Sequence, residues 1–337
     1  MNDAVVQIVM PVYNAAGTLP RALDSLQAQT FQKWECIVVD DGSIDDSPAI
    51  LKHYQNRDKR FRVVSKQHAG IVQALNTGLD RCSAPFVARM DADDESLPRR
   101  LEQQLALLDS HPGIGVASCL VKHGQTHKTQ RGYNLYVEWT NAIITPEAHY
   151  LNRFIESPLA HPTVMFRGEL IERSGGYREH PCWPEDYELW LRWMQAGVTF
   201  AKVPEILYHW TDYPERLSRT DQRYSTEAFY ACKTAYLAKG PLAHATTVGI
   251  WGAGRITRKR AALLESYGYT IQFYVDIDPD KIGRQVCGVP VLAPETLAQM
   301  PDIPLLAYVG SRGAREAIRR RLKDTRYSEG VTFWCVA

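Results

Sequence analysis

The chain has 337 residues, of which 45% are hydrophobic and 23% are charged, so it is long enough to bury one large core or two smaller ones. Its 39 basic and 38 acidic residues give a formal net charge of +1, which excludes a general attraction to nucleic acid. We therefore expect a globular protein that does not bind nucleic acid and that meets any small anionic partner at a local site.

The sequence carries no signal for a membrane span or a disulfide framework. No apolar run approaches the roughly 18 residues that a span needs, and no basic segment precedes the first apolar run. The seven cysteines are odd in number, widely scattered and without a Cys-x-x-Cys pair. We expect reduced cysteines and a cytoplasmic protein, and peripheral contact with the inner face of a membrane stays open.

Apolar runs with β-strand character alternate with helical patterns along the first hundred or so residues. The runs are 5–12, 34–39, 61–65 and 86–90, and the helical patterns begin near Thr18, at Asp45 or Ser47, after Gly70 and at Pro98. This alternation predicts a mostly parallel sheet with helices on both faces. Ligands of such sheets gather at the carboxyl ends of the strands, so the residues that follow each run are candidate site residues.

The last of these runs stops at three carboxylates, Asp91, Asp93 and Asp94, with Ala92 between the first two. Their charges repel one another unless a cation lies between them, and oxygen ligands of this kind suit Mg2+ or Mn2+. A solvated acidic loop is the alternative, because an isolated Asp-x-Asp pattern is weak evidence. The position after a buried strand favours the metal site.

Two earlier strand ends carry further candidates. Pro11 and Tyr13 end the first run, and Asp40 and Asp41 end the second. Turn chemistry explains each pair taken singly, since Asp and Pro are ordinary turn formers. Together with the acidic cluster they describe a cleft with an aromatic ring, hydrogen-bond acceptors and a metal site, which suits a nucleoside diphosphate.

Five ordered motifs in the first two thirds of the chain resemble those of the family 2 inverting glycosyltransferases, which have the GT-A fold. The motifs are Ile8–Asn14, Val38–Asp45, Asn76–Gly78, Met90–Asp94 and Pro184–Trp190. The resemblance implies an α/β fold with a GT-A sheet for a nucleotide-diphosphate sugar. It also implies metal-dependent, inverting transfer of one sugar from a UDP- or dTDP-linked donor to the hydroxyl of a saccharide or lipid-linked saccharide, in surface glycan or lipid-linked saccharide synthesis.

The resemblance further assigns roles to the strand-end residues. Pro11 and Tyr13 would line the pocket for the base, while Asp40 and Asp41 would accept hydrogen bonds from the base and the ribose. The acidic cluster would hold Mg2+ or Mn2+ through its first two carboxylates, with the third behind them or as a substitute ligand. Arg89 either assists at the nucleotide or is a surface cation paired with the neighbouring acids.

The transfer also needs a base, because an acceptor hydroxyl is a poor nucleophile until a carboxylate takes its proton. In the resemblance this base is Asp186, with Glu185 supporting or positioning it. Both acids stand at the start of a predicted helix, where acids are also common as caps, so capping is the alternative.

Two late segments depart from patterns common in the family. Many relatives carry an Arg-x-His after the last strand of the domain, whereas here His209 is displaced from that register and Tyr213 stands near the expected position. A role for either at the metal stays open. Leu189–Trp193 lacks the Gln of the Gln-x-x-Arg-Trp motif of processive synthases, which indicates addition of one sugar per encounter.

Residues 245–337 give a second α/β pattern after a GT-A domain expected over 1–240. A strand at 247–251 leads to Gly252 and Gly254, a helix at 255–267 follows, and a strand at 270–275 ends at Asp276. This layout predicts a small Rossmann-like domain that binds a nucleotide through Gly252, Gly254, Arg255 and Asp276, although Thr257 replaces the third glycine. A scaffold without a ligand, or a module for homo-oligomers, explains the same pattern.

Two other functions compete with sugar transfer. An NAD(P)-dependent oxidoreductase of sugar metabolism would be centred on residues 245–337, but the incomplete glycine motif and the lack of a Tyr-x-x-x-Lys pair weigh against it. A non-catalytic protein that only binds nucleotide sugars is the second alternative. It would be preferred if Asp186 proved unable to reach a bound donor.

Overall fold

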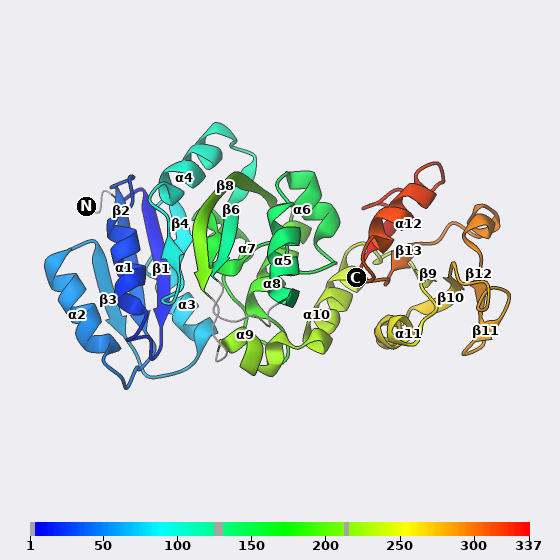
Figure 1. The fold of residues 1–337 in the computed structure, drawn as a ribbon, viewed down its shortest axis with the longest axis horizontal. Coiled ribbons are helices and arrows are strands. Elements are labelled where there is room, and N and C mark those ends of the chain that lie inside the picture. The colour runs from blue at the N-terminus through cyan, green and yellow to red at the C-terminus, as the bar shows by residue number, and fades with distance from the viewer. Residues whose placement is uncertain (1–3, 125–130, 212–215) are drawn as a thin grey trace. The chain divides into compact units, whose positions relative to one another are not determined.

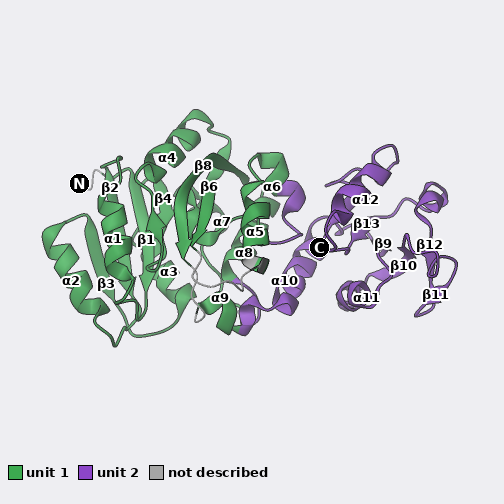
Figure 2. Ribbon diagram, in the orientation of Figure 1, with its two compact units in different colours: residues 1–149, 158–181, 185–221 green, residues 150–157, 182–184, 222–337 purple. Residues whose placement is uncertain are grey.

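The computed structural model describes residues 4–124, 131–211 and 216–337. The chain divides into two compact units (Figure 2): unit 1 comprises residues 1–149, 158–181 and 185–221, and unit 2 comprises residues 150–157, 182–184 and 222–337. These ranges differ from the domains 1–240 and 245–337 expected from the sequence, and the expected boundaries stay a prediction. No helix in the described part of the chain is both long and apolar enough to cross a membrane.

The described residues of unit 1 form an eight-stranded sheet in the order β3-β2-β1-β4-β7-β6-β8-β5 (Figure 1). Its strands are β1 (Val6–Val12), β2 (Trp34–Asp40), β3 (Phe61–Ser65), β4 (Phe86–Arg89), β5 (Glu95–Ser96), β6 (Ile114–Gly124), β7 (Met165–Arg167) and β8 (Thr199–Thr211). The first four strands of the chain pair in parallel, as their alternation with helices predicts. β7 then runs antiparallel to β4 and β6, so the whole sheet is mixed.

Helices cover both faces of this sheet. They are α1 (Leu19–Gln27), α2 (Ser47–Arg57), α3 (Ile71–Leu79), α4 (Arg100–Ser110), α5 (Arg131–Asn141), α7 (Glu169–Ser174), α8 (Glu185–Gln195) and α9 (Leu217–Thr220), and α6 (Pro146–Asn152) begins in unit 1 and ends in unit 2. Leu23 of α1 packs with Ile8 of β1 in one core, whereas Leu75 of α3 packs with Val9 in the other. Successive residues of β1 therefore face different cores, which explains why this strand is almost continuously apolar.

Unit 2 contains a six-stranded sheet within residues 247–335, in the order β11-β12-β10-β9-β13-β14. Its strands are β9 (Thr247–Trp251), β10 (Thr270–Val275), β11 (Gln285–Val286), β12 (Val289–Leu292), β13 (Leu305–Ala307) and β14 (Phe333–Cys335), and its helices are α10 (Thr226–Lys239), α11 (Arg255–Ala261) and α12 (Ala314–Leu322). The strands β12, β10, β9, β13 and β14 are parallel. The helix expected over 255–267 is α11 followed by the 3-10 helix η3 (Ala262–Tyr267).

A buried lysine ties together the separate segments of unit 2. Lys233 of α10 is 1% exposed, and its ammonium donates hydrogen bonds to the carbonyl oxygens of Ile155 at 2.6 Å and Val336 at 3.1 Å. Its charge also lies over the ring of Tyr230, 4.3 Å from the centroid. These contacts explain why the short stretch 150–157 belongs with the C-terminal sheet.

Candidate functional site

The carboxyl ends of β2, β1 and β4 are neighbours in the sheet of unit 1. Val12 of β1 pairs with Asp40 of β2, and Val9 pairs with Arg89 of β4. The backbone N–H of Asp41 still donates to the carbonyl of Val12 at 2.8 Å. The structure therefore brings the three strand-end groups named by the sequence to one edge of the sheet, where parallel strands present ligand sites.

An exposed pair of stacked rings lies at the end of β1. Tyr13 is 47% exposed, and its ring stacks on His68 with centroids 4.1 Å apart and planes inclined by 24°. Pro11, two residues earlier in the strand, is buried. An exposed aromatic surface of this kind can accept a planar ligand by stacking.

Asp41 organises the loop that carries His68. Its carboxylate accepts hydrogen bonds from the Lys66 ammonium at 2.7 Å and from the backbone N–H groups of Ala69 at 3.1 Å and Gly70 at 2.8 Å. The His68 Nδ1 atom lies 2.9 Å from the same carboxylate. The carboxylate is thus largely occupied by this chain's own groups.

Asp40 has a similar local role, because its Oδ1 atom accepts a hydrogen bond from the backbone N–H of Ser43 at 3.0 Å.

Sequence reasoning did not find Lys66 or His68 as partners of Asp41. They reach Asp41 from 25 and 27 positions further along the chain, and no local pattern marks such a contact. The predicted contacts of Asp40 and Asp41 with a base and a ribose stay a prediction.

The three carboxylates after β4 converge. Asp91, Asp93 and Asp94 each offer an oxygen atom, and these atoms all lie within 4.8 Å of one another. β8 fixes the cluster, because the backbone N–H of Thr211 donates to Oδ1 of Asp94 at 2.7 Å. Arg21 of α1 adds a hydrogen bond of 2.6 Å to the carbonyl oxygen of Asp93.

The electrostatics of the cluster are those of a candidate cation site. Burial, and then the charge of Asp93, raise the pKa of the Asp94 carboxyl well above its ordinary value, and burial and Asp91 likewise raise the pKa of Asp93. Oδ2 of Asp94 is buried and has no hydrogen-bond partner among the described residues. Three converging carboxylates, one of which has a buried oxygen without a partner among the described residues, fit a divalent cation such as Mg2+ or Mn2+.

Two arginines face the cluster. Arg89 is 3% exposed and its guanidinium contacts Oδ1 of Asp91, so it is a buried cation rather than a surface one. Arg216 Nη2 lies 3.7 Å from Oδ2 of the same aspartate. Ala92, between the first two carboxylates, is buried. The two guanidinium groups offset part of the repulsion among the carboxylates, and they place positive charge beside the cluster.

Asp186 and Glu185 stand at the start of α8. Burial, and then the charge of Glu185, raise the pKa of the Asp186 carboxyl to about 8. The backbone N–H of Tyr187 donates to Oδ1 of Asp186 at 2.7 Å, which favours the charged form, and the charge of Arg89 acts in the same direction. A carboxylate tuned toward neutral pH is suited to proton transfer.

Of the two late candidate residues, the structure describes only His209. Nδ1 of His209 lies 3.1 Å from a carboxylate oxygen of Glu95, its partner across β8 and β5. Tyr213 lies outside the described residues. A role for His209 or Tyr213 at the metal therefore stays a prediction.

In unit 2, the carboxylate of Asp276 contacts the loop that contains Gly252 and Gly254. Oδ2 of Asp276 accepts a hydrogen bond from the backbone N–H of Ala253 at 2.9 Å, and Oδ1 accepts one from Asp278 at 3.0 Å. Gly252 has a φ of +108°, and a Cβ there would lie 2.8 Å from the side chain of Val309. A Cβ on Gly254 would meet nothing within 4 Å. Nucleotide binding through Gly252, Gly254 and Asp276 stays a prediction.

Comparison with known proteins points to one family. The family model described as glycosyl transferase family 2 matches residues 7–173. The chain is 32% identical over 203 residues to the amylovoran biosynthesis glycosyltransferase AmsE of Erwinia amylovora, an alignment covering 59% of this chain and 73% of that protein. It is 26% identical over 238 residues to the O-antigen biosynthesis glycosyltransferase WbnJ of Escherichia coli, covering 68% of this chain and 85% of that protein.

Solved structures share the fold at lower identity. The crystal structure of S. aureus TarS residues 1–349 in complex with UDP-GlcNAc superposes with a TM-score of 0.57 at 18% identity, covering 78% of this chain and 71% of that one. The mannosyltransferase PcManGT from Pyrobaculum calidifontis, in complex with GDP-Man and Mn2+, superposes with a TM-score of 0.50 at 22% identity, covering 69% of this chain and 62% of that one.

Proposed function

The chain belongs to glycosyl transferase family 2 and is therefore a glycosyltransferase, and from this premise we propose that it moves one sugar from a nucleotide-diphosphate donor to an acceptor hydroxyl, with a divalent metal and with inversion. The observation that carries the proposal is the convergence of Asp91, Asp93 and Asp94 after β4, with an exposed aromatic pair at the end of the neighbouring strand β1. The names of two structural neighbours, which state UDP-GlcNAc in one case and GDP-Man with Mn2+ in the other, support a nucleotide-sugar donor.

The donor base stacks at Tyr13, with Pro11 behind it and Asp40 and Asp41 beside it. Lys66 and His68 are held against Asp41, so we assign to Asp41 the ordering of the loop beside the base, and its contact with a UDP- or dTDP-linked donor rests on the family's motif alone. Arg89 and Arg216 face the acidic cluster and offer positive charge to the diphosphate.

Asp91 and Asp93 hold the metal, and Asp94 holds it with them or supports them from its buried position. When bound, Mg2+ or Mn2+ neutralises the charge that develops on the departing diphosphate. The chain's own contribution is to hold the three carboxylates together against their repulsion, through the contacts from β8 and α1. That repulsion is the physical reason why the cluster binds a cation.

Asp186 is the base that takes the proton from the acceptor hydroxyl, with Glu185 beside it. Attack from the face opposite the diphosphate inverts the anomeric carbon. The acceptor is a saccharide or a lipid-linked saccharide, and the names of the two curated relatives, which state amylovoran and O-antigen biosynthesis, support a role in surface glycan synthesis. Leu189–Trp193 lacks the Gln of processive synthases, which supports transfer of one sugar per encounter.

The test begins with metal-linked thermal stabilisation against a panel of nucleotide sugars that includes UDP-GlcNAc, UDP-glucose, dTDP-linked sugars and GDP-mannose, with Mn2+. Release of nucleotide diphosphate from the stabilising donor is then measured for the wild type and for Asp186→Asn. We expect the variant to bind the donor as the wild type does and to lose about 10²–10⁴-fold in turnover, the usual contribution of a general base.

An active Asp186→Asn enzyme would refute the assignment of the base. Donor binding without turnover in the wild type would contradict transfer of the sugar from that donor.

A further inference from the structure

The segment that carries the acidic cluster leaves the sheet of unit 1 at the end of β4. The last residue of β4 to pair with β1 is Arg89, opposite Val9, and the backbone N–H of Met90 still donates to the carbonyl oxygen of Val9 at 3.2 Å. The next strand, β5, begins only at Glu95. The three carboxylates therefore lie on a stretch without strand pairing, whose backbone groups need other partners.

Arg100, the first residue of α4, binds one of these backbone groups. Its Nη2 atom donates to the carbonyl oxygen of Arg89 at 3.0 Å, and its Nη1 atom donates to the carbonyl oxygen of Pro162 at 3.0 Å. Pro162 belongs to the 3-10 helix η1 (His161–Thr163), which precedes β7. Because the guanidinium is planar and rigid, it holds the end of β4 at a fixed spacing from this helix.

Tyr208 of β8 binds a second backbone group. Its hydroxyl oxygen accepts a hydrogen bond from the backbone N–H of Asp91 at 3.3 Å. The guanidinium of Arg100 lies over the ring of this tyrosine, with Cζ 5.2 Å from the centroid. Both side chains are fully buried. Arg100 and Tyr208 therefore contact each other, and they also contact the chain on either side of Met90.

The charge of Arg100 has no carboxylate partner in the part of the chain that the structure describes. Within that part the guanidinium forms no ion pair, and its buried Nε atom has no hydrogen-bond partner. A buried cation without a counter-charge loses solvation, a cost that a packed apolar side chain would avoid. What the arginine adds over an apolar residue is its hold on the carbonyl oxygens of Arg89 and Pro162.

We propose that Arg100 and Tyr208 are positioning residues for the acidic cluster, and that their hydrogen bonds on either side of Met90 hold the first carboxylate where a divalent cation needs it. The inference rests on the proposed function, because it takes the cluster as the metal site. Mg2+ accepts only a narrow range of ligand positions. The contacts from Arg21 and Thr211 hold the later part of the cluster in the same way.

Positioning and simple electrostatics predict opposite effects on metal affinity. If Arg100 acted only through its charge, its removal would relieve repulsion of the cation, and Mn2+ would bind more tightly. If it acts by positioning, its removal releases the carbonyl group of Arg89, Asp91 leaves its place, and Mn2+ binds more weakly. The direction of the change in Mn2+ affinity therefore separates the two explanations.

The test measures the dissociation constant of Mn2+ for the full chain without donor, from the electron paramagnetic resonance signal of the free ion, at a temperature where each variant is folded. Arg100→Met should weaken Mn2+ binding by about tenfold or more, as for other side chains that orient metal ligands. Tyr208→Phe keeps the ring and removes one neutral hydrogen bond, so it should weaken binding by about two- to tenfold. It decides the point if Arg100→Met does not fold.

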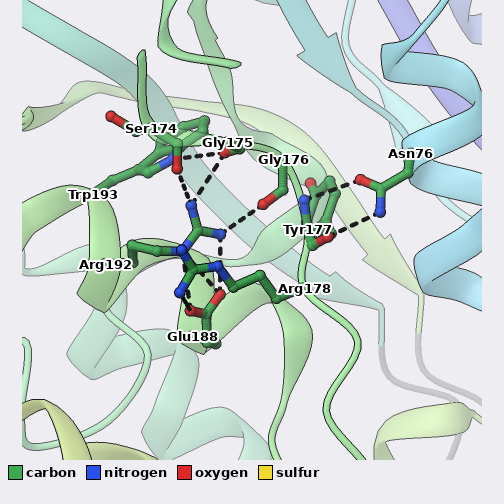
Figure 3. Close-up of polar contacts among 9 residues, drawn as sticks. All are labelled: Asn76, Ser174, Gly175, Gly176, Tyr177, Arg178, Glu188, Arg192 and Trp193. Atoms are coloured by element: carbon green, nitrogen blue, oxygen red, sulfur yellow. Dashed lines mark hydrogen bonds and ion pairs between the residues drawn. The ribbon is translucent and has the colours of Figure 1, made fainter. Parts of the chain in front are cut away.

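Arg192→Met is the matched control. Arg192 is also a buried arginine, 9% exposed, and its guanidinium donates to the carbonyl oxygens of Ser174, Gly175 and Gly176 (Figure 3). None of these contacts involves the acidic cluster. The dissociation constant of Mn2+ for this variant should stay within about twofold of the wild-type value, even if its melting temperature falls as far as that of Arg100→Met.

Unchanged or tighter Mn2+ binding in Arg100→Met or in Tyr208→Phe would overturn the inference. An equal loss of affinity in Arg192→Met would also overturn it, because the effect would then follow stability and not position. If the wild type turns over its donor with Mn2+ while both variants bind Mn2+ as it does, this inference alone fails. A wild-type chain that binds no Mn2+, with or without donor, would refute the metal site of the proposed function first.

Discussion

Unit 1 and unit 2 both place an acid in the segment that follows a strand of their sheet, and the two acids have opposite surroundings. Asp94, after β4, has a buried oxygen without a hydrogen-bond partner among the described residues, and burial and its acidic neighbours raise its pKa. Asp276, after β10, accepts hydrogen bonds from two backbone N–H groups, and the Nζ atom of Lys281 lies 3.3 Å from its Oδ2 atom. Burial opposes the change, but these hydrogen bonds lower the pKa of Asp276.

The difference teaches how to separate a binding carboxylate from a structural one. A carboxylate that already has its hydrogen bonds stabilises the fold and offers little to a ligand, whereas one held among like charges gains most from an added cation. On this criterion the acidic cluster of Asp91, Asp93 and Asp94 is prepared for a ligand, and Asp276 closes the turn that follows β9.

The largest expected effect is on catalysis. Asp93→Ala should lower sugar transfer by about 10³-fold or more and abolish Mn2+-linked stabilisation, because it removes one of the three proposed metal ligands. Asp276→Ala, assayed at a temperature where it is folded, should change transfer by no more than about twofold. Donor turnover and Mn2+-dependent melting measure both. Equal losses of turnover in the two variants would contradict the difference between the acids of the two units.

The pH dependence of turnover should follow the raised pKa of Asp186, about 8. A base acts in its ionised form, so activity is present above this pKa and falls as the pH drops below it. We expect kcat to rise about tenfold per pH unit below 8 and to level off above it. A profile at saturating donor and Mn2+ checks this. A flat profile between pH 6 and 8 would contradict the environment described for Asp186.

The smallest expected effect is on stability, where two Asp→Asn substitutions should behave differently. At pH 7 without metal, Asp276→Asn should lower the free energy of unfolding by about 1–3 kcal/mol, because hydrogen bonds to a charged group are lost. Asp94→Asn should stay within about 1 kcal/mol of the wild type, because the removed charge repulsion offsets an unsatisfied amide. Denaturant unfolding measures both.

The sign for Asp276 follows from its lowered pKa. The stability that the Asp276 carboxylate contributes is present above its pKa in the unfolded chain and is lost as the pH falls through its pKa in the folded chain. The effects of the two substitutions on the free energy of unfolding should therefore converge toward acidic pH. A more destabilising Asp94→Asn at neutral pH would reverse the comparison between the two acids.

Much of the fold could be predicted because strands and helices follow local patterns. The strands Phe61–Ser65, Thr247–Trp251 and Thr270–Val275 and the helix Ile71–Leu79 have the bounds that their apolar patterns indicate. The helix expected from Pro98 begins at Arg100. The antiparallel pairing of β7 with β4 could not be predicted, because it joins residues about 80 positions apart and has no local signal.

The sequence by itself determined which acids follow buried strands, since the spacing of apolar residues sets where a strand ends and what comes next. Only the tertiary structure decided which of those acids have partners. Asp276 meets the backbone of Ala253, and Asp41 meets Lys66 and His68, whereas Asp94 keeps an oxygen without a partner among the described residues. The same holds for Tyr177, because its backbone N–H and carbonyl form hydrogen bonds with the side-chain amide of Asn76, 101 positions away in the chain. The physical reason is that hydrogen bonds and charge repulsion act over a few ångströms in space, so chain folding, and not sequence spacing, selects the groups that meet.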